Sequence, residues 1–133
     1  MEGFKFDFRL YVLINGVAPM RIYMFEDGLA RLATVKYEPP VKENLHRLKM
    51  HLTNYAINKN STSFVYNTAG DKDDIGSKRS FKSILRLIHK QFGPAAVAKC
   101  LAEIKDLIIK TCCISQPHVF HLMRSAQPDD LQN

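Results

Sequence analysis

The sequence of 133 residues contains no tryptophan, only three cysteines and no long apolar run. The cysteine count is odd and two cysteines, Cys112 and Cys113, are adjacent, which is a poor disulfide framework and favours a reducing cytosol. No apolar run approaches the roughly 18 residues that span a membrane, and the first residues lack the basic-then-apolar pattern of a secretory signal. These absences argue against a secreted disulfide-rich domain and against a membrane-spanning protein.

Several common site motifs are also missing. The sequence has no Gly-rich phosphate loop ending in Gly-Lys-Ser/Thr and no Gly-x-Gly-x-x-Gly motif. Its five histidines show no metal-ligand spacing with cysteine, so no metal site is predicted within the chain. Acidic residues are outnumbered, 13 against 19 Lys and Arg, which gives a net charge of +6. This surplus favours an acidic partner: a nucleotide, a nucleic acid, an anionic membrane or an acidic protein.

The stretch 4–15 carries the clearest pattern. Every even position is apolar, whereas the odd positions begin with Lys5, Asp7 and Arg9. A period of two predicts a half-buried β-strand with one charged face. Neighbouring members of the charged row lie about 6 to 7 Å apart on an extended backbone. One polyanionic ligand could therefore touch several of them, although a solvated face with cross-strand ion pairs remains the alternative.

Residues 16–19, Gly-Val-Ala-Pro, are a turn signal, and two further strands are predicted after it. Residues 21–26 and 29–34 are rich in β-formers, and Asp27-Gly28 between them is a strong signal for a two-residue hairpin turn. Residues 4–34 are therefore predicted to form a three-stranded antiparallel meander. Arg31 in its last strand would face the same side as the charged row. Arginine grips phosphate oxygens with two donors, and lysine acts as a point charge, so this group suits a triphosphate.

For the second half of the chain, the sequence pattern predicts a short strand followed by helices. Two prolines after Glu38 end the meander, and residues 50–58 are predicted to form a short fourth strand. Ser80 is the expected N-cap of a first amphipathic helix, which Gly93 ends; a second helix then runs from Pro94 to about Ile114. The fold class is α+β, an antiparallel sheet followed by two amphipathic helices. We expect these segments: sheet and ligand-contacting residues 4–58, mobile loop 59–79, helical pair 80–115 and irregular tail 116–133.

Two further polar segments are candidate binding sites. Thr53 and Asn54 lie at the end of the predicted short strand and could hydrogen-bond a ligand, or could form an ordinary turn. Ser77 and Lys78 come just before a helix start, where exposed backbone N–H groups favour anions. A solvated loop end is the alternative for this second segment.

In combination, these blocks resemble the tubulin tyrosine ligase-like family of ATP-grasp amino-acid ligases, and most of all its tubulin polyglutamylase branch. They occur in the family's order, with similar spacing, from Lys5 to about Thr111. The resembling stretches are residues 5–13, Pro19 to Tyr23, Asp27 to Thr34, Met50 to Lys59 and Gly76 to Arg79.

The resemblance implies roles by position. Four residues match positions that bind ATP: Lys5, Asp7, Thr53 and Asn54. Three match contacts of the incoming amino acid: Arg31, Ser77 and Lys78. Arg9 matches a basic residue near the phosphates, so that Arg9 and Arg31 are the expected catalytic cations.

The family's reaction gives the expected function. ATP phosphorylates an acceptor carboxylate on a tubulin C-terminal tail, and the amine of free L-glutamate attacks the acyl phosphate to form an isopeptide bond. The resemblance implies Mg²⁺ as a cofactor, with its carboxylate ligands outside this chain, because the family's metal-binding strands follow the second helix. We therefore expect the chain to be the central portion of the enzyme and to be inactive alone. Tubulin and microtubules are the expected partners, in the cytoplasm and cytoskeleton and at the cilium or basal body, with no membrane partner.

The alternative is a non-catalytic basic module that binds acidic tails or nucleic acid. Two features count against nucleic acid. Asp7 lies between Lys5 and Arg9, where it would repel a phosphate backbone. The aromatic residues Phe4, Phe6 and Phe8 share the core face, so that they cannot stack on bases on the charged face.

Overall fold

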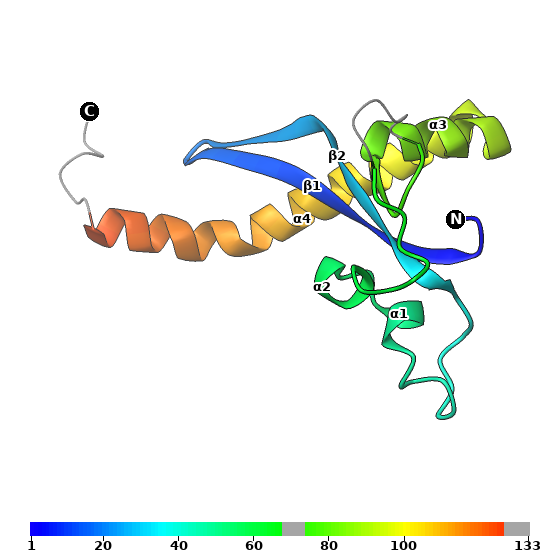
Figure 1. Cartoon of the computed structure of the whole chain (residues 1–133). Helices are drawn as coiled ribbons and strands as arrows, with labels where there is room; N and C mark the ends of the chain where they lie inside the picture. The colour runs from blue at the N-terminus through cyan, green and yellow to red at the C-terminus, as the bar shows by residue number, and fades with distance from the viewer. Residues whose placement is uncertain (68–73, 127–133) are drawn as a thin grey trace. The chain divides into compact units, whose positions relative to one another are not determined.

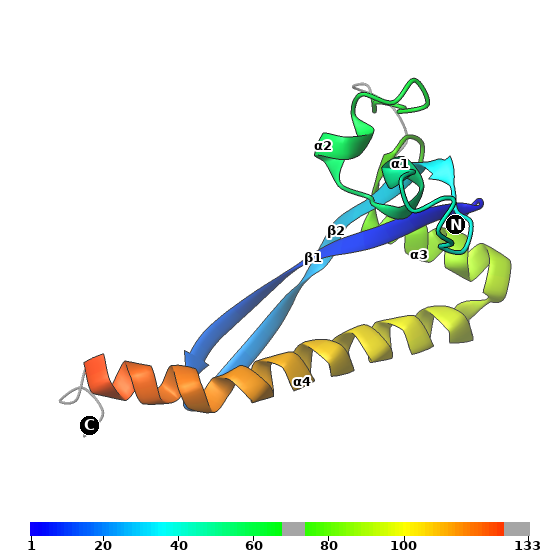
Figure 2. The ribbon, with the colours of Figure 1, turned by 90° about the horizontal axis from the view of Figure 1, so that it is seen from below.

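The computed structural model describes residues 1–67 and 74–126, and two long antiparallel strands dominate it (Figure 1). Strand β1 spans Phe4–Val17 and strand β2 spans Met20–Lys36. Both views show them side by side as a twisted ribbon (Figures 1 and 2). The turn between them is Ala18-Pro19, joined by a cis peptide bond, at the turn that the sequence predicts. The strand predicted at residues 4–15 is thus confirmed.

The predicted hairpin turn at Asp27-Gly28 is wrong, because β2 continues through both residues. The Asp27 carboxylate accepts a hydrogen bond from the backbone N–H of Gly28 at 2.8 Å and another from Lys82 at 3.1 Å. Gly28 is needed for space: a Cβ there would collide with the carbonyl oxygen of Arg9 on β1. Gly28 therefore permits the close approach of β1 and β2, and this role leaves the same sequence signal as a glycine in a turn.

The third strand is short and lies elsewhere in the sequence. Strand β3, Lys78–Ser80, pairs antiparallel with β2, so that the sheet order is β1-β2-β3. Its register places Lys78 opposite Arg31, Arg79 opposite Ala30 and Ser80 opposite Leu29. The α+β class is confirmed, but its third strand comes from the segment predicted to be loop. Part of that predicted loop, residues 68–73, lies outside the described residues.

The short fourth strand predicted at residues 50–58 is also wrong. The segment forms two single-turn helices, α1 at Leu48–His51 and α2 at Tyr55–Asn58. Backbone donors bond locally, from Leu52 N–H to the Leu48 carbonyl at 2.8 Å and from Asn58 N–H to the Asn54 carbonyl at 3.1 Å. Because these donors are used within the segment, they are not available to a strand ladder.

The first long helix, α3, spans Phe81–Phe92 and follows β3 without a linker. Ser80 caps it as expected, because the Ser80 hydroxyl oxygen accepts a hydrogen bond from Ser83 N–H at 2.9 Å. Phe81 is buried and meets Phe8 of β1 edge to face, with ring centroids 4.9 Å apart. The helical spacing of the apolar residues predicts Phe92 on the same buried face as Phe81 and Ile84, but the Phe92 side chain is 64% exposed.

The second long helix, α4, spans Pro94–Ala126 after Gly93, whose φ is +82°. It extends twelve residues past the predicted end near Ile114, with Pro117 inside it. The prediction of an irregular segment from residue 116 is therefore wrong up to Ala126, and residues 127–133 lie outside the described residues. Proline lacks an N–H and crowds the preceding helical turn, and for this reason Pro117 predicted a helix end. The Gln116 side chain donates a hydrogen bond to the Val17 carbonyl at 3.0 Å.

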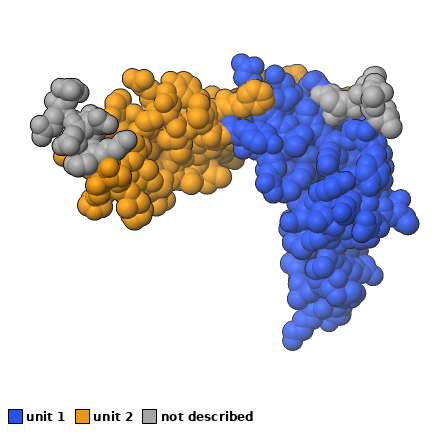
Figure 3. Space-filling view, turned by 60° about the vertical axis from the view of Figure 1, so that its left-hand side comes forward, with its two compact units in different colours: residues 1–11, 26–88 blue, residues 12–25, 89–133 orange. Residues whose placement is uncertain are grey.

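The chain divides into two compact units, coloured separately in Figure 3: residues 1–11 with 26–88, and residues 12–25 with 89–133. The core of the first unit consists of Ala30, Leu32, Ala33, Met50, Phe81 and Ile84. In the described part of the second unit, the buried apolar side chains are Val17 and Cys112. Among the helices described, none has the length and apolar character to cross a membrane.

Candidate functional site

The site is built around a bidentate ion pair between Asp7 of β1 and Arg31 of β2, here called the Asp7–Arg31 fork. Arg31 donates from Nε to Asp7 Oδ1 at 3.0 Å and from Nη2 to Asp7 Oδ2. The two side chains are 18% and 33% exposed. Two parallel bonds hold a guanidinium in one plane, which a lysine could not do. Arg31 thus faces the charged row of β1, as the alternating pattern predicts.

The environment keeps both members of the pair charged. Burial alone would raise the pKa of Asp7, but hydrogen bonds from Arg31 and Thr53 and the charges of Arg31 and Arg9 outweigh it, so that this pKa lies below its ordinary value. The hydrogen bond to Asp7 likewise raises the pKa of Arg31, against the opposing effect of burial. Asp7 is therefore a carboxylate and Arg31 a cation at neutral pH.

A second cation stands beside this pair. The backbone of Lys78 is paired with that of Arg31 across β2 and β3. Its Nζ lies 3.8 Å from the centroid of the Tyr55 ring, a cation–π contact, and Lys59 Nζ lies 5.9 Å from the same ring. The ring quadrupole attracts the ammonium and restricts its freedom. Lys78 is therefore held by an aromatic side chain.

The neighbouring residues Ser77 and Arg79 have structural partners. The Ser77 hydroxyl oxygen accepts a hydrogen bond from Val65 N–H at 3.1 Å. Arg79 forms a forked pair with Glu2, with both distances 2.9 Å. The hydrogen bond from Arg79 lowers the pKa of Glu2, more than burial raises it. Whether Ser77 also contacts an amino acid stays a prediction.

Thr53 and Asn54 lie between α1 and α2, where a buried side chain fixes their backbone. The side chain of Asn58 donates hydrogen bonds to the carbonyl oxygens of Leu52 at 2.8 Å and Asn54 at 3.1 Å. Sequence reasoning missed Asn58, since an asparagine within a predicted strand gives no signal of what it will bond. Thr53 helps to lower the pKa of Asp7 by hydrogen bonding, and these are two of the four residues assigned to ATP.

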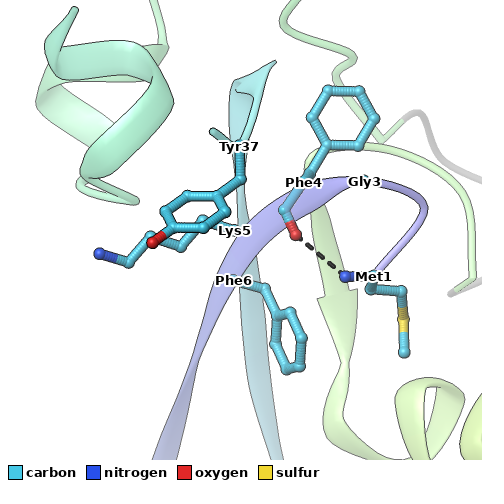
Figure 4. A pocket seen from close by; sticks show the side chains of 6 residues that line it. All are labelled: Met1, Gly3, Phe4, Lys5, Phe6 and Tyr37. Atoms are coloured by element: carbon cyan, nitrogen blue, oxygen red, sulfur yellow. Dashed lines mark hydrogen bonds between the residues drawn. The ribbon is translucent and has the colours of Figure 1, made fainter. Parts of the chain in front are cut away.

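Lys5 belongs to a different place. It lines a cavity of about 360 Å³ together with Met1, Gly3, Phe4, Phe6 and Tyr37 (Figure 4). Within this cavity wall, the Met1 amino group donates to the Phe4 carbonyl oxygen at 3.0 Å. Asp7 and Arg31 are not part of the wall. Arg9 is exposed and acts on Asp7 through its charge. The structure thus groups Asp7, Arg31 and Thr53, pairs Lys78 with Arg31 across β2 and β3, and places Lys5 apart from them in the cavity wall.

The described part of the chain contains no cluster of side chains of the kind that holds a metal ion. Among residues 1–67 and 74–126, no three His, Cys, Asp or Glu side chains are grouped so that they could hold one. Mg²⁺ is usually bound by only one or two carboxylates together with phosphate oxygens and water, so that the location of its ligands outside this chain stays a prediction.

The model of the tubulin-tyrosine ligase family matches residues 1–130, and the chain belongs to this family. Among its relatives, it is 45% identical over 133 residues to a probable beta-tubulin polyglutamylase of Tetrahymena thermophila. It is also 42% identical over 128 residues to tubulin polyglutamylase TTLL7 of Mus musculus and 45% identical over 111 residues to tubulin polyglutamylase TTLL5 of Homo sapiens.

The matches cover nearly all of this chain and little of each relative. They include 100% of the chain and 11% of the Tetrahymena protein, 96% of the chain and 14% of mouse TTLL7, and 84% of the chain and 8% of human TTLL5. The chain therefore spans about a tenth of the length of the curated relatives that it matches.

Proposed function

We propose that this chain is part of an ATP-dependent ligase that adds glutamate to the C-terminal tails of tubulin through an isopeptide bond. The observation that carries the proposal is the Asp7–Arg31 fork with Lys78 opposite it in register. Membership of the tubulin-tyrosine ligase family and similarity to tubulin polyglutamylases support the choice of reaction and of acceptor.

The incoming glutamate is the ligand for Arg31 and Lys78. Free glutamate carries two carboxylates, and two neighbouring cations on adjacent strands suit such a ligand. Asp7 holds two donor groups of Arg31, Nε and Nη2, in a fixed plane. The orientation of the guanidinium is therefore set before the ligand arrives, which lowers the entropy cost of binding. Ser77 completes the amino-acid contacts in this proposal.

The ATP contacts are Lys5, Thr53 and Asn54, with Asp7 next to them and Arg9 near the phosphates. The acceptor carboxylate attacks the γ-phosphorus of ATP, and ADP leaves. The amine of glutamate then attacks the acyl carbon, loses a proton and displaces phosphate. Arg9 and Arg31 stabilise the negative charge that develops in both steps. The carboxylate ligands of Mg²⁺ are expected from parts of the enzyme outside this chain, so no step is assigned to that ion.

The net charge of +6 favours association with acidic tubulin tails. In this proposal the protein acts on microtubules, as part of the cytoskeleton, including that of cilia and basal bodies. The 133-residue chain alone is expected to give no turnover.

The test places residues 1–133 in the matching position of mouse TTLL7 and measures ATP-dependent incorporation of glutamate into microtubules. We expect the chimera to be active, and Arg31→Lys, which keeps the charge but loses the fork, to reduce kcat/KM about 100-fold. Lys110→Ala, on an exposed part of α4, is the matched cationic control and should change it less than twofold. An active Arg31→Lys chimera, or turnover by the isolated chain, would contradict the proposal.

A basic binding module is the second candidate, and one observation favours it. Tyr55 and Tyr66 are exposed on either side of Phe64, and Lys59 and Lys78 lie by the Tyr55 ring. Exposed aromatic rings beside cations can stack on bases. Salt-titrated binding to oligonucleotides and to glutamate-rich peptides separates the two candidates. Tight oligonucleotide binding with a steep salt dependence would favour the binding module.

A further inference from the structure

The side chain of Asn58 uses its whole hydrogen-bonding capacity inside the first unit. It is 1% exposed. Its Oδ1 accepts from the backbone N–H of Thr34 at 3.0 Å and from the Thr34 hydroxyl at 2.8 Å. Its Nδ2 donates to the carbonyl oxygens of Leu52 at 2.8 Å and Asn54 at 3.1 Å. A buried amide with every partner in place is specific, because the only other side chain with this set of donors and acceptors, glutamine, is one methylene longer.

The partners of Asn58 belong to two parts of the candidate site. The two carbonyl groups that it binds come immediately before and immediately after Thr53. Thr34 lies on β2, three positions beyond Arg31. A hydrogen bond from Thr53 is among the causes of the lowered pKa of Asp7, and Asp7 forms the bidentate pair with Arg31. Asn58 therefore ties the segment that carries Thr53 to β2, the strand that carries Arg31.

We propose that Asn58 is a positioning residue that fixes Thr53, and through Thr53 the Asp7–Arg31 fork, in the orientation used for ligation. The inference rests on the proposed function for its kinetic consequence but not for its structural one. Aspartate at this position would keep the acceptor and lose both donors, so that two carbonyl groups would face a carboxylate. Asn58→Asp is therefore the sharpest variant, because it changes almost no volume.

The structural consequence is tested by hydrogen exchange in the chimera that carries this segment within mouse TTLL7. We expect Asn58→Asp to speed exchange about tenfold or more in peptides that cover residues 52–58, and to leave peptides of α4 unchanged. Asn60→Asp introduces the same charge on an exposed neighbour and should leave both unchanged. Thr34→Val is the milder second variant, since it removes only the hydroxyl bond to Asn58. Unchanged exchange at residues 52–58 in both Asn58→Asp and Thr34→Val would overturn the inference.

The kinetic consequence is tested by a double-mutant cycle with Thr53→Val. We expect Asn58→Asp to lower kcat/KM about tenfold when Thr53 is present and less than twofold when residue 53 is valine. The loss of thermal stability should be the same in both backgrounds, which separates positioning from general destabilisation. Equal, additive effects on kcat/KM would show that Asn58 does not act through Thr53, and would overturn the inference.

The two proposals fail in different ways. If the parent chimera incorporates no glutamate, the proposed function fails, and the exchange experiment still decides whether Asn58 holds Thr53. If the parent chimera is active and the cycle is additive, the proposed function stands and the positioning role fails.

Discussion

The unit of residues 1–11 and 26–88 and the unit of residues 12–25 and 89–133 differ in what holds them together. The first buries apolar side chains from β2, α1 and α3, and pairs its buried polar groups in detail, as at Asn58. The second, in its described part, buries only the apolar side chains of Val17 and Cys112. Both units expose large apolar side chains, Tyr66 in the first and Ile114 in the second among them. Every residue of the Asp7–Arg31 site belongs to the first unit.

The difference explains where a site can be built. A fork such as Asp7–Arg31 needs rigid strands and neighbours that exclude water, which a packed core supplies. The first unit therefore has the buried core that a site scaffold needs, whereas the described part of the second unit buries few apolar side chains.

The test with the largest expected effect makes the same isoleucine-to-alanine substitution in each unit. Ile84→Ala on α3 removes a side chain with 0% exposure, and Ile114→Ala on α4 removes one with 83% exposure. We expect the free energy of unfolding to fall by about 2–5 kcal/mol for Ile84→Ala and to change by about 0.5 kcal/mol or less for Ile114→Ala. Urea unfolding of the 133-residue chain measures both. Similar losses of unfolding free energy at the two positions would show that the two units do not differ in the stability that buried side chains supply.

A smaller effect is expected from the ion pair of the first unit. Asp7→Asn should lower the free energy of unfolding by about 1 kcal/mol at pH 7, after allowance for solvent screening. The pKa of Asp7 is lowered in the folded chain, so its contribution is present above the ordinary aspartate value of about 4 and is lost as the pH falls through the folded pKa.

The pH dependence supplies the check. Urea unfolding between pH 7 and pH 2 should show the difference between wild type and Asp7→Asn shrinking toward zero in acid. Glu26→Gln is the control, because Glu26 is 89% exposed and pairs with Lys82 at 3.7 Å. A difference that stays constant in acid would show that the Asp7 carboxylate charge is not what stabilises this unit.

The smallest effect is expected from an ion pair of the second unit. Lys110 Nζ lies 2.6 Å from Asp106 Oδ2 on the exposed face of α4. Asp106→Asn should change the free energy of unfolding by about 0.5 kcal/mol or less, and 1 M salt should remove the effect. If Asp106→Asn lowered the free energy of unfolding as much as Asp7→Asn does in the same urea assay, the ion pairs of the two units would not differ in strength.

The sequence predicted the fold where local patterns decide it. The alternation of β1, the turn at Ala18-Pro19 and the boundary at Gly93 between α3 and α4 all follow from neighbouring residues. The errors come from long-range contacts. Asp27 and Gly28 look like a turn because their true partners, Lys82 and Arg9, are distant in sequence. Strand β3 has only three residues, so that only its pairing with β2 makes it a strand.

The candidate site was predictable in its charged half. The period of two placed Asp7 on the face that Arg31 reaches, and the fork confirms that orientation. The ligand roles of these residues stay predictions. The positions of Lys78 over Tyr55 and of Asn58 between two carbonyl groups could not be predicted, because both depend on single-turn helices in a segment whose composition favoured a strand.

The direct junction of β3 and α3 has a mechanical consequence. Ser80 ends the strand and Phe81 begins the helix, and the Asp27 carboxylate fastens the first turn of that helix to β2. With no spacer at the joint, the backbone from which Lys78 projects and the start of α3 share one continuous chain segment anchored on β2. A substitution that loosens either anchor, the β2–β3 pairing or the Asp27 bond, should therefore disturb both the strand and the helix.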